Sequence, residues 1–240
     1  MIDEFMRKLV DFNAHLLPCM REYVTDPLVS VQIMQEMAER FGIDSFCLTA
    51  DFDATAETVA MFLLRMERSK KRLKPYLPKN LSVKYFTSVL LLRDLSLTPD
   101  LDKLLFSSEK LLPLRLPMCS YEDWMDLEFN HLLYKNKFGL FFTSFEIAVL
   151  LYPQEILDKL IRISRAVFQF NYRALSDPKV CKIIKQMIAQ RKPVLLGTSL
   201  DSMEKVYFYE MSHYLRCART QFSAEEHRIL LGQARWFESL

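Results

Sequence analysis

Acids, an amide, two serines and one histidine follow directly after, or lie within, short apolar runs of this chain. They are Asp11, Asn13, His15, Asp51, Ser144, Glu146, Ser199 and Asp201. Carboxylates and a neutral imidazole can hold a divalent cation, and two carboxylates held close together can work as an acid and base pair. What these residues do therefore depends on whether the surrounding elements bring them together.

Short β-rich runs alternate with longer helical patterns from one end of the chain to the other, which predicts a parallel sheet. The expected strands are Leu9 to Asn13, Ile43 to Thr49, Ser82 to Leu92, Leu111 to Pro117, Gly139 to Ser144, Ala166 to Asn171 and Pro193 to Ser199. Seven β/α units can form an open doubly wound sheet or a closed barrel. In both architectures the site lies at the carboxyl ends of the strands.

Helical patterns fill the segments between these runs. Helices are expected over about 27 to 41, Ala54 to Lys74, Tyr121 to Lys137, Pro153 to Ser164, Asp177 to Arg191, Met203 to Cys217 and from Ser223 onward. Asp26 precedes a first-turn proline and Gly42 follows the last apolar position, so both ends of the first helix are specified. Ser223 and Glu226 have the spacing of a capping box, which starts the final helix.

Composition and charge limit the class of protein. The chain has 240 residues, half of them apolar, and 32 basic against 30 acidic side chains, so no strong field attracts nucleic acid. No run approaches the roughly 18 apolar residues of a membrane-spanning helix. We expect a single domain over 1–240, located in the cytoplasm, whose five cysteines are buried free thiols.

Familiar catalytic motifs do not occur. With only four glycines, the sequence has no phosphate-binding glycine loop, and no G-x-S-x-G turn surrounds Ser144 or Ser199. His131, His213 and His227 lack the spacing of a zinc motif, so we interpret them as surface or packing residues. The residues at the strand ends remain the candidates.

The first of these segments, VDFNAHLLP (Val10 to Pro18), resembles the opening of a known family. It is similar to the PHP-type (polymerase and histidinol phosphatase) tyrosine phosphatases linked to bacterial capsular and exopolysaccharide synthesis, which begin with D-x-H-x-H-x-x-P. Asp11, His15 and Pro18 match this motif, whereas Asn13 replaces the first metal-binding histidine. The resemblance implies a distorted seven-stranded, TIM-like (β/α) barrel.

Later segments resemble the family in the same order. FGIDSFCLTADF (Phe41 to Phe52) is similar to the segment ending in T-P-H, with Asp51 at the histidine position. The metal-bridging glutamate of the family falls near Val89. LPLRLP (Leu112 to Pro117) resembles the strand before the long helix and carries no ligand. Two of the family's ligands are thus replaced here.

Two further motifs are similarly altered. FFTSFEIA resembles the stretch bearing H-P-E-R, with Ser144 for the histidine, Glu146 matching the acid and Ile147 for the arginine. VLLGTSLDS resembles the last metal motif, S-D-A-H, with Ser199 for the aspartate and Asp201 for the histidine. Only one ligand position that can be placed, that of the histidine after the first strand, keeps its residue.

The substitutions imply a degenerate PHP barrel. Several ligands must converge before metal binding offsets the cost of ordering and deprotonating a site, and valine or serine offers an ion little. We therefore expect no resident cofactor, no metal-dependent phosphatase activity, and a pocket at the barrel mouth used for binding or regulation. Its expected lining is Asp11, Asn13, His15, Asp51, Ser144, Glu146, Ser199 and Asp201.

Two alternatives stay open. The first is an active phosphoesterase whose oxygen-rich site, built from His15, Asp51, Glu146 and Asp201, binds a divalent cation weakly; His15, Asp51 and Asp201 are then the catalytic candidates. The second is an assembly scaffold. Aromatic residues around Tyr207 to Tyr209 exceed what one helix face can bury, which leaves a homo-oligomer open. The partner, small molecule or protein, is not identified by the sequence.

Overall fold

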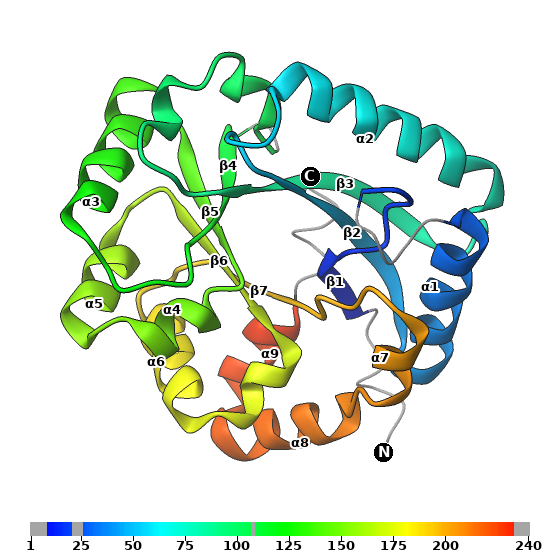
Figure 1. Cartoon of the computed structure of the whole chain (residues 1–240). Helices are drawn as coiled ribbons and strands as arrows, with labels where there is room; N and C mark the ends of the chain where they lie inside the picture. Colours follow the sequence, from blue (N-terminus) through cyan, green and yellow to red (C-terminus); the bar gives the residue numbers. More distant parts are fainter. Residues whose placement is uncertain (1–8, 21–25, 107–108, 233–240) are drawn as a thin grey trace.

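Seven parallel strands follow one another in chain order around a nearly closed barrel in the computed structural model, which describes residues 9–20, 26–106 and 109–232 (Figure 1). They are β1 (Leu9–Ala14), β2 (Ile43–Phe52), β3 (Ser82–Leu90), β4 (Leu111–Arg115), β5 (Gly139–Thr143), β6 (Ala166–Asn171) and β7 (Val194–Gly197). The expected distorted, seven-stranded barrel is confirmed, and the open sheet is excluded.

The helices lie outside the barrel (Figure 1). They are α1 (Pro27–Phe41), α2 (Val59–Leu73), α3 (Asp123–Asn130), α4 (Glu146–Leu151), α5 (Gln154–Arg162), α6 (Pro178–Ala189), α7 (Met203–Tyr207), α8 (Met211–Gln221) and α9 (Ala224–Leu231). Within the described ranges, no helix is both long and apolar enough to cross a membrane.

The predicted helix ends are confirmed where the sequence specified them. The Asp26 side chain accepts a hydrogen bond from the backbone N–H of Leu28 at 2.8 Å, and Gly42 ends α1 in the left-handed region with φ 71°. Ser223 and Glu226 form the reciprocal bonds of a capping box at the start of α9. Local sequence alone therefore fixes these boundaries.

The predicted helix over Ala54 to Lys74 was wrong in its first turn. Asp53 accepts hydrogen bonds from the backbone N–H and hydroxyl of Thr55, at 2.8 and 2.7 Å, which makes a turn instead of a helix. Thr58 then caps α2 by accepting from the N–H of Met61 at 3.3 Å. The helix α2 therefore begins after Thr58, five residues beyond Asp53.

Two long predicted helices also differ from the structure. The helix expected over Tyr121 to Lys137 comprises α3 followed by a π-helical turn, His131–Lys135. The one expected over Met203 to Cys217 is broken between α7 and α8. In the break, the Tyr209 hydroxyl donates a hydrogen bond to Asn171 Oδ1 at 2.6 Å, and this contact holds the chain against the barrel end.

The cysteine expectation was right for two residues and wrong for two. None of the five cysteines, all of which are described, forms a disulfide; Cys47 and Cys181 are buried, Cys217 is half-buried, and Cys19 and Cys119 are exposed. An apolar neighbourhood in sequence does not bury a side chain that lies in a connecting segment.

The core has two layers separated by the sheet. The larger layer lies between the strands and the surrounding helices. The smaller one fills the barrel and consists of Val10, Phe12, Cys47, Phe86, Phe106, Leu111, Phe141, Val167 and Leu195. Phe86 and Phe141 stack inside the barrel with ring centroids 5.6 Å apart. The barrel is therefore plugged, and a ligand can approach only at one of its two ends.

Candidate ligand site at the carboxyl ends of the strands

A polar layer lies directly above this apolar plug. Because side chains alternate along a strand, the residues two positions beyond Phe86, Phe141 and Val167 share the inward face with them. These residues are Ser88, Thr143 and Gln169, and all three are buried. The hydroxyl oxygens of Ser88 and Thr143 are 3.1 Å apart, so they hydrogen-bond across the intervening strand. Polar groups thus line the barrel where its strands end.

The amide of Asn13 is the centre of a second part of this layer. Its Nδ2 donates to Ser199 Oγ at 3.0 Å and lies 3.4 Å from both Gln169 Oε1 and Ser144 Oγ. Three predicted site residues, from the ends of β1, β5 and β7, therefore meet here. Gln169 was missed; its only signal was one amide within the apolar run FQF.

Backbone conformation holds the two serines in place. Ser144 and Ser199 have φ values of 52° and 55°, in the left-handed region that non-glycine residues rarely occupy. The N–H of Ser144 donates to Gln169 Oε1 at 2.8 Å, and the N–H of Ser199 donates to the Asn13 carbonyl at 2.8 Å. A positive φ costs free energy in a non-glycine residue, and these two hydrogen bonds offset that cost at Ser144 and Ser199.

Asp11 is fully buried and closes the barrel between β1 and β7. Its Oδ1 accepts from the backbone N–H groups of Asn13 and Thr198, both at 2.9 Å, and its Oδ2 accepts from the Thr198 hydroxyl at 2.5 Å. Burial raises the pKa of Asp11 to about 6, and these hydrogen bonds partly oppose the increase. These hydrogen bonds join β1 to Thr198, directly after β7, at a junction that we call the β1–β7 seam. Asp11 is therefore a structural residue of this seam.

Asp51 faces a basic residue that the sequence interpretation passed over. Arg115 ends β4, and its Nη1 lies 3.6 Å from Asp51 Oδ2 at the end of β2. Both side chains remain partly exposed, 34% for Arg115 and 20% for Asp51, so solvent reaches this pair. The protein itself thus supplies a cation beside the acid that replaces a family ligand.

Glu146 lies at the start of α4 and is tied to the end of β6. Its Oε2 accepts from the N–H of Asn171 at 3.1 Å. Burial raises the pKa of Glu146 to about 7, against the lowering effect of backbone hydrogen bonds. Asn171 in turn donates from Nδ2 to the Thr198 carbonyl at 2.7 Å, which links β6 to β7.

His15 and Asp201 follow β1 and β7 and are both buried. The N–H of His15 donates to the carbonyl of Leu200 at 3.0 Å, so the two segments run side by side. Asp201 forms an ion pair with Lys205 at 2.7 Å. A shared cluster of His15, Asp51 and Asp201 side chains stays a prediction.

The residues present do not fit the metal centre that the resemblance implies. Within 9–20, 26–106 and 109–232, no three His, Cys, Asp or Glu side chains form a group that could hold a metal ion. Asp51 already faces a guanidinium and Asp201 an ammonium group, and the raised pKa of Glu146 leaves this carboxyl group only partly ionised near pH 7. A cation placed beside Asp51 or Asp201 would meet the positive charge of Arg115 or Lys205.

Comparison with solved structures identifies proteins of the same fold. The chain aligns with a solved structure of YwqE from Bacillus subtilis and CpsB from Streptococcus pneumoniae, unique metal-dependent tyrosine phosphatases, with a TM-score of 0.68 and 17% identity over 96% of this chain and 95% of that one. The resemblance to the PHP fold is thereby confirmed.

A second solved structure supports the same fold. Histidinol phosphate phosphatase from Lactococcus lactis, solved with zinc, L-histidinol and phosphate, aligns with a TM-score of 0.52 and 12% identity over 89% of this chain and 94% of that one. No protein-family model and no curated protein sequence matches the chain. At these identities the likeness establishes architecture alone.

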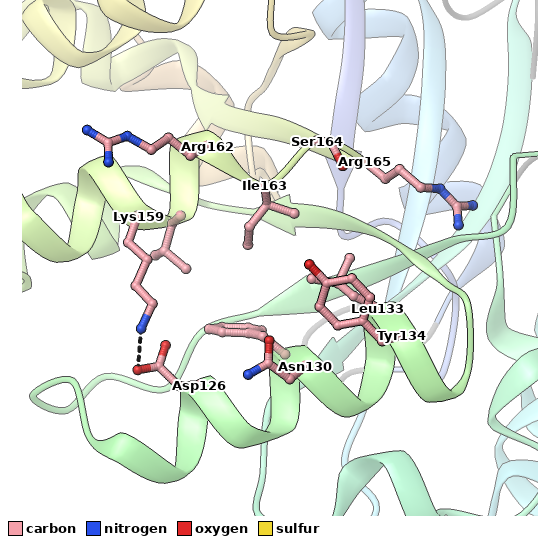
Figure 2. Close-up of a pocket in the computed structure, with 11 residues that line it drawn as sticks. Asp126, Asn130, Leu133, Tyr134, Lys159, Arg162, Ile163, Ser164 and Arg165 are labelled. Carbon is pink, nitrogen blue, oxygen red and sulfur yellow. Dashed lines mark ion pairs between the residues drawn. The ribbon is translucent and has the colours of Figure 1, made fainter.

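A cavity of about 250 Å³ lies elsewhere, between α3 with its π-helical turn and α5 (Figure 2). Phe129, Leu133, Leu160 and Ile163 give it an apolar lining. Asp126 and Lys159 form an ion pair at 2.5 Å at one side of the cavity (Figure 2). None of the sequence-predicted site residues lines this cavity.

Proposed function

We propose that this chain is a PHP-type barrel without metal-dependent phosphatase activity, whose mouth binds a ligand in a binding or regulatory role. The observation that carries the proposal is the Asp51–Arg115 ion pair beside the amide and hydroxyl network of Asn13. Asp51, Asn13, Ser144 and Ser199 occupy positions where the resemblance places metal ligands, and Arg115 does not. The two features replace metal charge with a fixed guanidinium and neutral hydrogen bonds.

Chemistry supports the same conclusion. Metal-dependent phosphoester hydrolysis needs an ion to lower the pKa of a bound water and to neutralise charge that develops on the phosphoryl group. Here the acids that remain are engaged: Asp11 with the seam, Asp201 with Lys205, and Glu146 with Asn171. Little carboxylate charge is left to assemble a centre with two or more metals.

The family resemblance suggests where such a protein works. We infer a bacterial, cytoplasmic protein connected with capsular or exopolysaccharide synthesis, in which a regulatory binding role is consistent with loss of the catalytic centre. The alternative is a phosphoesterase with an oxygen-rich site of His15, Asp51, Glu146 and Asp201. The fold that this chain shares with the metal-dependent tyrosine phosphatases YwqE and CpsB favours this alternative.

Metal content and turnover together test the proposal. The purified full chain is analysed for Mn, Fe and Zn, and its hydrolysis of an aryl phosphate with added Mn²⁺ is compared with that of Asp201→Ala. We expect far less than one metal ion per chain and equal, background rates for both proteins. Near-stoichiometric metal, or Mn²⁺-dependent turnover that disappears in the variant, would establish the phosphoesterase instead.

A further inference from the structure

Arg115 is the one basic residue of β4, and the alternation of that strand turns it into the barrel. Leu112 and Leu114 pack in the outer layer, whereas Leu111 belongs to the cluster that fills the barrel. Arg115, four positions after Leu111, shares its inward face. It lies beside Thr143 in register on β5, at the level of the polar layer.

The guanidinium has few partners for its five N–H donors. Its contact with Asp51 is an ion pair at 3.6 Å, longer than a hydrogen bond. Its Nε is buried and has no hydrogen-bond acceptor among the described residues. A buried N–H donor without an acceptor is costly, so this side chain gains when a suitable acceptor enters the mouth.

We propose that Arg115 binds the carboxylate of a small monoanionic ligand at the barrel mouth, with Asp51 as the intramolecular group that the ligand displaces. A guanidinium and a carboxylate match as a planar, two-bond pair. The 34% exposure of Arg115 gives such a ligand access from solvent. The inference rests on the proposed function, because a metal centre at this mouth would place further positive charge beside the Arg115 guanidinium.

The surrounding charges favour a single negative charge over two. Arg115 is already balanced by Asp51, and Lys205 by Asp201. The remaining acids of the mouth, Asp11 and Glu146, add negative charge as they ionise. A phosphate dianion would meet this charge without the metal ions that neutralise it elsewhere, whereas one carboxylate exchanges places with that of Asp51.

The Nε–H signal of Arg115 in proton–nitrogen NMR spectra provides a direct test. It is assigned by its loss in Arg115→Lys and followed while the full chain is titrated with acetate, lactate and benzoate. Inorganic phosphate and chloride are titrated at matched ionic strength. We expect a saturable shift with at least one carboxylate, a weaker response to phosphate, and a linear or absent response to chloride.

Variants separate specific binding from a general salt effect. Asp51→Asn removes the competing carboxylate and is expected to tighten carboxylate binding by roughly threefold, within the range of a partly exposed ion pair. Arg115→Gln should abolish the saturable shifts of neighbouring backbone signals, whereas Arg162→Gln on α5 should leave them unchanged. Should Arg115→Gln fail to fold, the Asp51 variant still decides.

Some results would overturn the inference. They are a carboxylate response equal to that of chloride, binding unchanged in Asp51→Asn, or phosphate bound more tightly than every carboxylate. Metal content and turnover are measured on the same preparation. If the protein is metal-free and inactive and does not bind carboxylates, only the proposed carboxylate ligand is refuted. If the protein contains metal and is active, the proposed function is refuted.

Discussion

Single side chains at the barrel mouth connect the strand ends through hydrogen bonds and one ion pair. Asn13 Nδ2 joins the ends of three strands by hydrogen bonds, and Arg115 places positive charge beside Asp51. Asp11 instead accepts three hydrogen bonds in a fully buried position. A carboxylate buried in this way resists ionisation, and its pKa therefore makes stability depend on pH.

Replacing Asp11 by asparagine should remove one such dependence. The pKa of Asp11 is raised from 3.8 to about 6 in the folded protein, mainly by burial, so the folded state binds its proton more tightly than the unfolded state. The free energy of unfolding of the native protein therefore decreases as the pH rises from about 4 to 6. We expect the free energy of unfolding of Asp11→Asn, relative to the native protein, to increase by about 1 to 3 kcal/mol across this window.

Urea unfolding at pH 4, 5, 6 and 7 measures this difference. Asp158→Asn is the control, because hydrogen bonds from Gln186 and Gln154 lower the pKa of Asp158 below its ordinary value of 3.8. The contribution of Asp158 to stability therefore changes only below about pH 4, and the difference between this variant and the native protein should be nearly constant from pH 4 to 7. A difference for Asp11→Asn that is flat, or that decreases with pH, would show that burial does not govern this carboxyl group.

At the scale of the elements, the seam between β1 and β7 depends on close approach of two backbones. The N–H of Ser199 donates to the Asn13 carbonyl at 2.8 Å, and a Cβ added to Gly197 would lie 2.7 Å from Asn13 N. Gly197 is therefore required by the space available, and its neighbours there are backbone or part of the Asn13 network.

The variant Gly197→Ala tests how tightly the seam is packed. Its methyl group would also lie 3.0 Å from Gln169 Nε2, so the two strands must separate or the amide network must shift. We expect a loss of about 2 to 4 kcal/mol in the free energy of unfolding, typical of severe overpacking.

Gly42→Ala is the matched comparison. Its Cβ would meet nothing within 4 Å, but the residue has φ 71°, so only backbone strain of about 1 kcal/mol is expected. Equal losses for the two variants in chemical denaturation would mean that the β1–β7 seam adjusts freely.

Most strands and helix ends could be predicted from the sequence, whereas two residues of the site could not. Alternating strands and helices, the caps at Asp26 and Ser223, and the residues that follow each strand were all predictable, because each depends on neighbours in the chain. Gln169 and Arg115 were not. Their roles depend on which face of a strand points into the barrel and on partners more than 20 residues away, such as Asn13 and Asp51.

The break between α7 and α8 escaped prediction for the same reason. The apolar periodicity over Met203 to Cys217 favours one continuous helix. The hydrogen bond from Tyr209 to Asn171 competes with that preference, and only the folded barrel brings these two residues together. Local propensity therefore failed where a tertiary contact at the mouth determines the path of the chain.

At the scale of the whole molecule, packing and hydrogen bonds among the described residues connect the strands of the barrel. An apolar plug fills the interior, a polar layer covers it, and hydrogen bonds of Asp11, Asn13 and Asn171 tie the strand ends together. In a barrel whose strand ends converge on bound ions, removal of the ions also removes stability, because ligands that bind only the folded state stabilise it.

The thermal stability of this protein should therefore be indifferent to metals. We expect the Tm of the full chain to be unchanged, within the error of the measurement, after treatment with EDTA and after addition of Mn²⁺, Zn²⁺ or Mg²⁺. Asp51→Asn should respond in the same way, since its partner Arg115 already opposes a cation at this position.

Arg115→Gln removes that opposing charge and is the sensitive variant: if the guanidinium excludes metals, the Tm of this variant should rise by a few degrees with saturating Mn²⁺. A comparable increase in the unaltered protein would show that the acids of the mouth still assemble a metal site around the guanidinium.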